Sequence, residues 1–144
     1  MNHEAVAKLE LPEVEELQRS ILVADDDESQ VLALTMRLEK QGFDTLSAYS
    51  GKQCIALAQS ERPSLIVLDV RMPDVDGLKV CEQLADSPGT CGIPIIILSG
   101  MSRPDIVRCS REVGCQYFVR KPYDPNALLT LIEHSLRQSE ECDW

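Results

Sequence analysis

Short apolar runs alternate along the chain with longer segments in which apolar residues recur at helical spacing. Residues 21–24, 65–68 and 95–98 are apolar throughout, and polar residues or proline flank each run. Runs this short, without alternation of polar and apolar positions, are typical of strands buried on both faces of a parallel sheet. Residues 45–48 and 117–119 fit two further strands, so the pattern predicts five.

A helix is predicted after each of these strands. Residues 51–60 and 78–85 give two of them, and Ser102 opens another, with Ile106, Cys109 and Val113 on one face before Gly114. The first and last helices each carry a single apolar face, at the spacing expected when one side of a helix packs on a sheet. The face of the first comprises Val31, Leu34, Thr35 and Leu38, and that of the last comprises Leu128, Leu131, Ile132, Ser135 and Leu136.

Residues suited to helix termini delimit the first helix. Asp27 is followed three residues later by Gln30, which predicts a capping box at the start. Gly42 predicts the end, in a Schellman motif that lets Phe43 pack back on Leu38. These boundaries leave residues 25 and 26 outside the helix, directly after the preceding strand.

Strand and helix therefore alternate five times, with Ser50 and Gln53 capping the second helix and Asp124 capping the last, where Pro125 takes the first position. This alternation predicts an α/β fold with a parallel sheet and helices on both faces. Right-handed crossovers leave a doubly wound sandwich as the simplest topology. In such sheets, ligands bind beyond the carboxyl ends of the strands.

Length and charge restrict the class of protein. The 144 residues fit one domain, which we place at residues 20–138, between an acidic tail over 1–19 and a short tail over 139–144. A net charge of −10 would repel phosphate backbones, so we expect no direct binding of nucleic acid. The sequence shows neither an apolar stretch long enough to span a membrane nor a signal peptide, and we expect a cytoplasmic chain.

Six cysteines could form disulfides or hold a metal. Without a secretion signal or a CxxC pair, we expect free, buried thiols instead. Neither of the two histidines, His3 and His134, stands at the spacing of a zinc ligand.

Charged and hydroxyl side chains follow four of the expected strands. Asp25 and Asp26 follow the first strand, Asp69 the third, Ser99 the fourth and Lys121 the fifth. Each alone has an ordinary structural explanation, such as a helix cap, a turn or a solvated loop. Together they predict a pocket with three carboxylates, one hydroxyl and one ammonium at a single edge of the sheet.

Three neighbouring carboxylates raise one another's pKa unless a cation neutralises them. Mg²⁺ prefers oxygen ligands and is commonly held by one or two carboxylates together with a phosphoryl oxygen. Lys121 could meet the same phosphoryl group as a point charge, and Ser99 could donate a hydrogen bond to it. The set suits a carboxylate nucleophile that forms an acyl phosphate, for which catalysis is mostly positioning and charge neutralisation.

Four motifs in order, ILVADDD, LIVLDVRMPDVDGL, IIILSG and YFVRKPY, resemble the receiver domains of two-component response regulators. The resemblance covers roughly residues 20–138 and implies a flavodoxin-like (βα)5 sandwich with strand order 2-1-3-4-5. It implies that Asp69 is the phosphoacceptor. It further implies that Mg²⁺ is bound by Asp69, directly by Asp26, chiefly through water by Asp25, and by the backbone carbonyl of Arg71.

The same resemblance gives roles to the later motifs. Ser99 would bind the phosphoryl group and draw its loop inward, and Lys121 would pair with the phosphoryl oxygens. Phe118 falls where the family has an aromatic switch residue, although it lacks the hydroxyl of a tyrosine. The peptide bond before Pro122 would be cis.

The function that the resemblance implies is a phosphorylation switch without enzymatic output. A sensor histidine kinase or a phosphotransfer protein would supply the phosphoryl group, and a shifted face would bind a downstream protein target, with homodimerisation possible. Because few residues follow position 138, we expect output through a partner rather than an attached domain.

Two other functions remain open at this stage. One is a receiver-like binding module that is never phosphorylated. The other is a phosphatase of the haloacid-dehalogenase type, whose nucleophile motif the Asp25-x-Asp27 pattern superficially resembles. The MPDVDG segment has no role in that phosphatase family.

Overall fold

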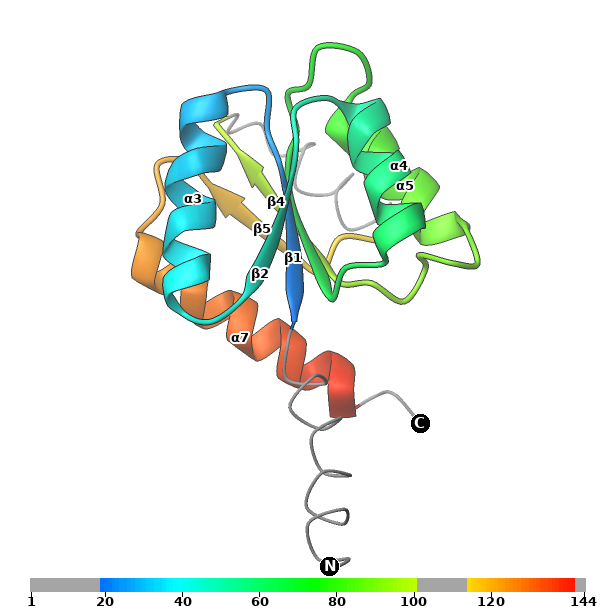
Figure 1. Ribbon diagram of the computed structural model, residues 1–144. Helices are drawn as coiled ribbons and strands as arrows, with labels where there is room; N and C mark the ends of the chain where they lie inside the picture. Colours follow the sequence, from blue (N-terminus) through cyan, green and yellow to red (C-terminus); the bar gives the residue numbers. More distant parts are fainter. Residues whose placement is uncertain (1–18, 101–113, 142–144) are drawn as a thin grey trace, which may run out of the picture.

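The computed structural model describes residues 19–100 and 114–141, with side chains to residue 139. A five-stranded parallel sheet forms its centre, in the order β2-β1-β3-β4-β5 (Figure 1). This order and the parallel pairing confirm the predicted flavodoxin-like topology. The strands are β1 (Ser20–Ala24), β2 (Asp44–Ala48), β3 (Leu65–Asp69), β4 (Ile95–Ser99) and β5 (Tyr117–Arg120).

Helices cover both faces of the sheet. In Figure 1, α3 (Glu28–Lys40) and α7 (Pro125–Glu141) lie on one face, while α4 (Gly51–Glu61) and α5 (Gly77–Asp86) lie on the other. The helix predicted from Ser102 lies outside the described residues, as does the acidic segment 1–18. No helix among those described is long and apolar enough to cross a membrane.

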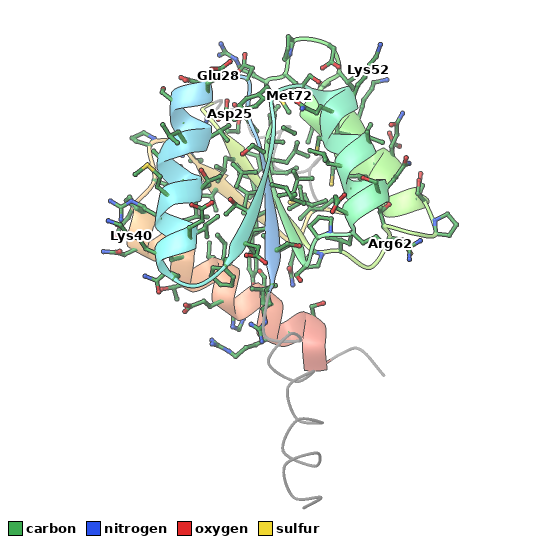
Figure 2. All side chains as sticks on the ribbon, in the orientation of Figure 1. Asp25, Glu28, Lys40, Lys52, Arg62 and Met72 are labelled. Carbon is green, nitrogen blue, oxygen red and sulfur yellow. The ribbon has the colours of Figure 1, made fainter. Side chains whose placement is uncertain are left out.

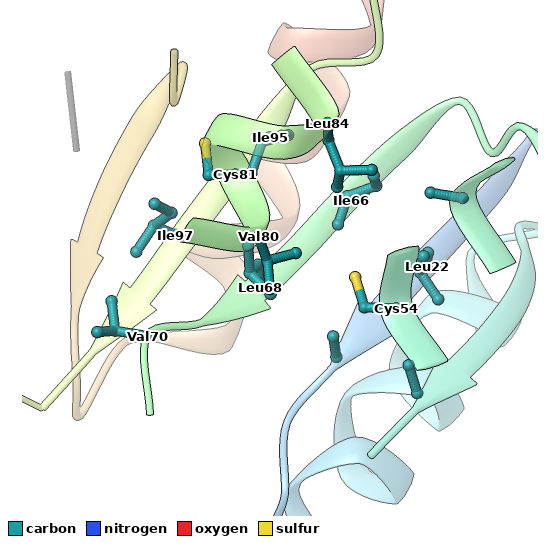
Figure 3. Packing of buried hydrophobic residues seen from close by; sticks show 13 residues of the cluster. Leu22, Cys54, Ile66, Leu68, Val70, Val80, Cys81, Leu84, Ile95 and Ile97 are labelled. Carbon is teal, nitrogen blue, oxygen red and sulfur yellow. The ribbon is translucent and has the colours of Figure 1, made fainter. Parts of the chain in front are cut away.

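Two apolar clusters fill the layers between sheet and helices. One packs β1, β3 and β4 against α4 and α5, and Figure 3 shows its members, among them Leu22, Cys54 and Cys81. The other packs the opposite faces of the same strands against α3 and α7. Every residue of β3 and β4 is buried, which explains why these strands are apolar without alternation.

The termini of α3 confirm one predicted cap and correct another. At its end, Phe43 N–H donates to Leu38 O at 3.1 Å and Gly42, with φ +94°, gives the left-handed turn, so the Schellman motif is confirmed. At its start, Asp27 caps the helix by accepting from Ser29 N–H at 3.0 Å. The predicted capping box was wrong in one respect. The Gln30 side chain does not accept from Asp27 N–H, which donates to Asp25 Oδ1; it accepts instead from Lys121 Nζ.

The other predicted caps also form. Ser50 Oγ accepts from Gln53 N–H at 3.1 Å, while Gln53 Oε1 accepts from Tyr49 N–H at 2.8 Å. Asp124 Oδ1 accepts from Asn126 N–H at 3.1 Å at the start of α7. Capping satisfies N–H groups that have no partner within the helix, so these contacts fix where each loop at this end of the sheet gives way to a helix.

None of the cysteines that the structure describes forms a disulfide, and contrary to the prediction they are not all buried. Cys54 and Cys81 are buried, Cys115 is half-buried and Cys91 is exposed. Burial raises the pKa of both the Cys54 and the Cys81 thiol to about 12. Cys91 is exposed because it stands in the loop between α5 and β4, not on a face that packs on the sheet.

Candidate functional site

The carboxyl ends of the strands place the predicted residues at one edge of the sheet. Asp25 follows β1 directly, Asp69 and Ser99 are the last residues of β3 and β4, and Lys121 follows β5. Because β1 lies between β2 and β3, the connections that leave β1 and β3 run to opposite faces and open a crevice between them. In Figure 2, Asp25 and Met72 lie at this end of the molecule, opposite Lys40 and Arg62.

Three carboxylates gather in this crevice. One oxygen from each of Asp25, Asp26 and Asp69 lies within 4.8 Å of the other two. Asp25 and Asp69 are buried, with 5% and 7% of their surface exposed, whereas Asp26 is exposed. The cluster therefore has two fixed acidic groups at its base and one at its mouth.

Lys121 links the two buried carboxylates. Its Nζ donates to Asp25 Oδ2 at 3.0 Å and to Asp69 Oδ2 at 3.2 Å. A third bond, to Gln30 Oε1 at 2.8 Å, completes the three donors of the ammonium group. Sequence reasoning missed Gln30, because its position three residues after an N-cap indicated a capping role and no local signal pointed to a lysine 91 residues away.

The electrostatics of Asp69 reflect this crowding. Burial, followed by the negative charge of Asp25, raises the pKa of the Asp69 carboxyl to about 6, although Lys121 opposes the shift. Burial alone would lower the pKa of Lys121, but its hydrogen bonds and charge contacts with Asp25 and Asp69 raise it instead. The ammonium therefore stays charged at neutral pH. A further positive charge beside Asp69 would stabilise the ionised form of its carboxyl.

The loop after β3 folds back on the phosphoacceptor candidate. Arg71 N–H approaches Asp69 Oδ1 at 3.3 Å, and Gly77 N–H donates to Val70 O at 2.8 Å. A side chain at Gly77 would overlap the backbone carbonyl of Asp69 and lie 2.7 Å from Val70 Cα. Glycine is therefore required there for α5 to start so close to the end of β3.

Ser99 and Phe118, the two predicted switch residues, lie in the neighbouring strands β4 and β5. Ser99 is buried, and its carbonyl accepts from Lys121 N–H at 2.8 Å, which ties the end of β4 to the lysine. Phe118 is half-buried and packs against the cluster beneath α4 and α5. The peptide bond between Lys121 and Pro122 is cis, as predicted. Most of the loop that Ser99 would move lies outside the described residues.

The donor set fits a divalent cation. Among the described residues, three carboxylates face one ammonium group in the crevice, so negative charge is in excess there, and carboxylate oxygens are hard donors. Asp25, Asp26 and Asp69 are the residues that could hold it. The rival phosphatase motif finds no support, because Asp27 is exposed and its carboxylate caps α3 through Ser29.

Comparisons with known proteins agree with this geometry. The family model of the response regulator receiver domain matches residues 21–133. The alkaline phosphatase synthesis transcriptional regulatory protein PhoP of Bacillus subtilis is 35% identical over 124 residues, which are 86% of this chain and 51% of PhoP. The DNA-binding response regulator MtrA of Mycolicibacterium smegmatis is 35% identical over 87% of this chain and 54% of MtrA. The chain thus spans about half the length of the curated relatives it matches.

Solved structures show the same fold. The receiver domain of a signal transduction histidine kinase from Syntrophus aciditrophicus is 32% identical, with a TM-score of 0.78 over 83% of this chain and 91% of that one. A receiver domain protein from Methanospirillum hungatei gives a TM-score of 0.82 over 86% of this chain and 98% of that one, and at 24% identity it shows the fold alone. With the match to the family model over most of its length, the chain belongs to the response regulator receiver domain family of two-component signalling.

Proposed function

We propose that this chain accepts a phosphoryl group on Asp69 and thereby changes a protein-binding face. One observation carries the proposal: a buried carboxylate at the end of β3 shares a lysine ammonium with a second buried carboxylate, beside a third. In such a pocket, the Asp69 carboxylate could attack a phosphoryl group while the neighbouring ammonium and carboxylates bind the charges that the reaction needs. Members of the family are signalling proteins and not enzymes with turnover on an external substrate.

In the transfer step, an oxygen of Asp69 attacks phosphorus and the bond from phosphorus to the donor's histidine nitrogen breaks. The imidazole leaves with the electron pair of that bond and takes up a proton. Lys121 then moves its hydrogen bond from Asp69 Oδ2 to an oxygen of the bound phosphoryl group. Gln30 and Asp25 keep the lysine in place during this exchange.

Receiver domains generally bind Mg²⁺, and we propose that the acidic cluster does so here. Asp26 would bind Mg²⁺ directly, and Asp69 would bind it through the carboxylate oxygen that does not attack phosphorus. Asp25 would bind it chiefly through water, and Arg71 would bind it through its backbone carbonyl. When bound, Mg²⁺ supplies positive charge to the phosphoryl oxygens. The excess of carboxylates over ammonium groups supports this assignment.

The output proposed for the phosphorylated state depends on Ser99 and Phe118. The Ser99 hydroxyl would donate to the phosphoryl group and draw in the segment that follows β4. Phe118 would then bury more of its ring. A local change in charge would thus bias an element with two arrangements, and the altered face would bind a downstream protein or a second copy.

A groove beside the site supports a protein as phosphodonor. It has a volume of about 430 Å³, lies between α3 and the segment after β5, and reaches Lys121. On α3 its wall includes the apolar residues Ala33, which is exposed, and Leu34, which is buried. A partly apolar groove suits an amphipathic helix, and a histidine kinase or phosphotransfer protein could present its histidine on one. The groove is lined by Gln30, Ala33, Leu34, Arg37, Lys121, Pro122, Tyr123 and Pro125.

The remaining predictions about partners and place go with this proposal. We propose that the described part of the chain contacts proteins and not nucleic acid, because the chain's net charge of −10 opposes binding to phosphate backbones. The names of relatives such as MtrA describe DNA-binding proteins about twice as long as the matched segment. A cytoplasmic location remains a prediction.

Incubation with acetyl phosphate and Mg²⁺, followed by intact mass measurement, tests the proposal. The wild type should gain the mass of one phosphoryl group, and Asp69→Asn should gain none. If the wild type gained nothing and also failed to bind beryllofluoride with Mg²⁺, the constitutive binding module would replace the phosphorylation switch.

A further inference from the structure

Asp74 joins the loop after β3 to a helix more than twenty residues earlier in the chain. Its Oδ1 accepts from Gly51 N–H at 2.8 Å and its Oδ2 accepts from Lys52 N–H at 3.1 Å. The same Oδ1 accepts from Val75 N–H at 2.9 Å within the loop. The carboxylate therefore caps α4 from outside while it also orders its own loop.

The start of α4 is capped from two directions. Ser50, which precedes the helix, accepts from Gln53 N–H, the third N–H of the helix. Asp74 accepts from the first and the second. An uncapped helix leaves its first N–H groups without partners, so both residues stabilise α4, but Asp74 in addition ties it to the β3–α5 loop.

The packing beneath this contact is too close for a side chain. A Cβ at Gly51 would lie 2.8 Å from Val75 Cβ, 3.0 Å from Val80 Cγ2 and 3.3 Å from Asp74 Oδ1. Glycine thus lets the first turn of α4 rest directly on the loop and on the first turns of α5. The labels of Lys52 and Met72 in Figure 2 show the start of α4 and this loop at the same end of the molecule.

Charge favours the contact as well. The start of a helix carries partial positive charge from its free N–H groups, and a carboxylate there is stabilised. The bonds from Gly51 and Lys52 hold the pKa of the Asp74 carboxyl below its ordinary value, so it is ionised at neutral pH.

The two ends of this link lead into the candidate site. On one side, the short turn before α4 follows Ala48, whose carbonyl accepts from Asp25 N–H at 3.1 Å. On the other side, the loop held by Asp74 carries Arg71, whose N–H meets Asp69. Asp74 therefore connects the backbone that holds Asp25 with the backbone that holds the Arg71 carbonyl.

We infer that Asp74 is a positioning residue, which clamps the β3–α5 loop to the start of α4 and so sets the spacing between the acidic cluster and the Arg71 carbonyl. The inference rests on the proposed function, in which that carbonyl and the acidic cluster share a divalent cation. Residues that support metal ligands in this way alter metal affinity without touching the metal.

Asp74→Ala and Ser50→Ala form a matched pair for the test. Both remove a side-chain acceptor from the start of α4, so both should lower the urea midpoint, but Asp74→Ala alone releases the loop. We expect Asp74→Ala to weaken Mg²⁺ binding, measured by calorimetry, about tenfold, the low end for residues that support metal ligands. Ser50→Ala should leave Mg²⁺ affinity unchanged. Asp74→Asn, which keeps one acceptor oxygen, should fall between Asp74→Ala and the wild type.

Amide hydrogen exchange measures whether Asp74 holds the β3–α5 loop in the protein without metal or phosphoryl group. In Asp74→Ala, the Arg71 and Gly77 amides should exchange faster than in the wild type, and in Ser50→Ala they should not. Equal effects of the two variants on Mg²⁺ affinity and on exchange would overturn the inference and leave Asp74 as a helix cap. If the wild type bound no Mg²⁺ and accepted no phosphoryl group, the proposed function would fail, while the exchange rates would still decide whether Asp74 clamps the loop.

Discussion

The Asp69 carboxylate is buried at the end of β3 and has little contact with solvent. It is 7% exposed, lies beside Asp25 and shares Lys121 with it. Burial, and after it the negative charge of Asp25, raises the pKa of the Asp69 carboxyl to about 6, and the shared ammonium of Lys121 offsets only part of this rise. The site therefore favours whatever brings further positive charge or removes one of the negative charges.

The raised pKa of Asp69 predicts that its ionised carboxylate lowers the stability of the folded chain as the pH rises, and that Asp69→Asn removes this effect. The pKa of Asp69 is about 6 in the folded chain and near its ordinary value of 3.8 when unfolded. Between these values the folded state binds more protons, so the stability of the metal-free wild type falls as the pH rises. The variant cannot ionise at this position. Its stability relative to the wild type should rise by about 1–2 kcal/mol from pH 4 to pH 7, a figure reduced for solvent screening.

Urea unfolding in a chelator at several pH values measures this difference. Asp44→Asn, which removes an exposed carboxylate at the far end of β2, serves as the control and should show no comparable trend. A relative stability of Asp69→Asn that stays flat or falls with pH would contradict this electrostatic account of the site.

At the scale of the elements, strands and helix termini were predictable because their determinants are local. The apolar runs gave β1, β3 and β4 within a residue, and Gly42 gave the end of α3. Gln30 was assigned wrongly to a cap and Asp74 received no role, because their partners are 91 and 22 to 23 residues away. Such contacts depend on tertiary packing, which a pattern within one segment does not encode. The strand ends were the exception, since parallel topology alone gathers them at one edge.

The exposed face of α3 leads to a prediction about the phosphodonor. Ala33→Glu places a charge on the α3 wall of the groove, where an amphipathic helix of the donor would pack. Because Ala33 is exposed, the substitution should leave stability nearly unchanged, within about 0.5 kcal/mol. It should slow phosphotransfer from a histidine kinase or phosphotransfer protein by about tenfold, the equivalent of about 1.4 kcal/mol.

The rate of phosphorylation by acetyl phosphate provides the internal control, since a small donor needs no docking face. Gln59→Glu on α4 is a matched surface substitution on the opposite side of the sheet. Equal slowing with the protein donor and with acetyl phosphate would contradict a docking role for α3.

For the whole molecule, the parallel sheet brings the carboxyl ends of β1, β3, β4 and β5 to one edge. The two apolar clusters hold the strands from both faces, and the crevice at the switch point carries the charge. A cation bound there joins the loops after β1 and β3, so its binding should stabilise the entire folded chain. Binding to the folded state alone adds free energy in proportion to the logarithm of ligand concentration over Kd.

Mg²⁺ should therefore raise the free energy of unfolding by about 1.4 kcal/mol at ten times its Kd. Asp26→Asn should abolish this gain while it leaves the metal-free stability little changed, because Asp26 is exposed at the mouth of the site. Calorimetric unfolding with and without Mg²⁺ measures both quantities, and Ca²⁺-free buffers avoid competition. An Asp26→Asn variant that gained as much stability from Mg²⁺ as the wild type would remove Asp26 from the ligand set.

The most direct test of the central claim identifies the residue that carries the phosphoryl group. After phosphorylation with acetyl phosphate and Mg²⁺, borohydride reduces an acyl phosphate to an alcohol, which converts a modified aspartate to homoserine. Peptide mass spectrometry then locates the change. We predict homoserine at position 69 alone, and none after phosphorylation in the presence of a chelator. Homoserine at position 25 or 26 with Asp69 intact would contradict the account.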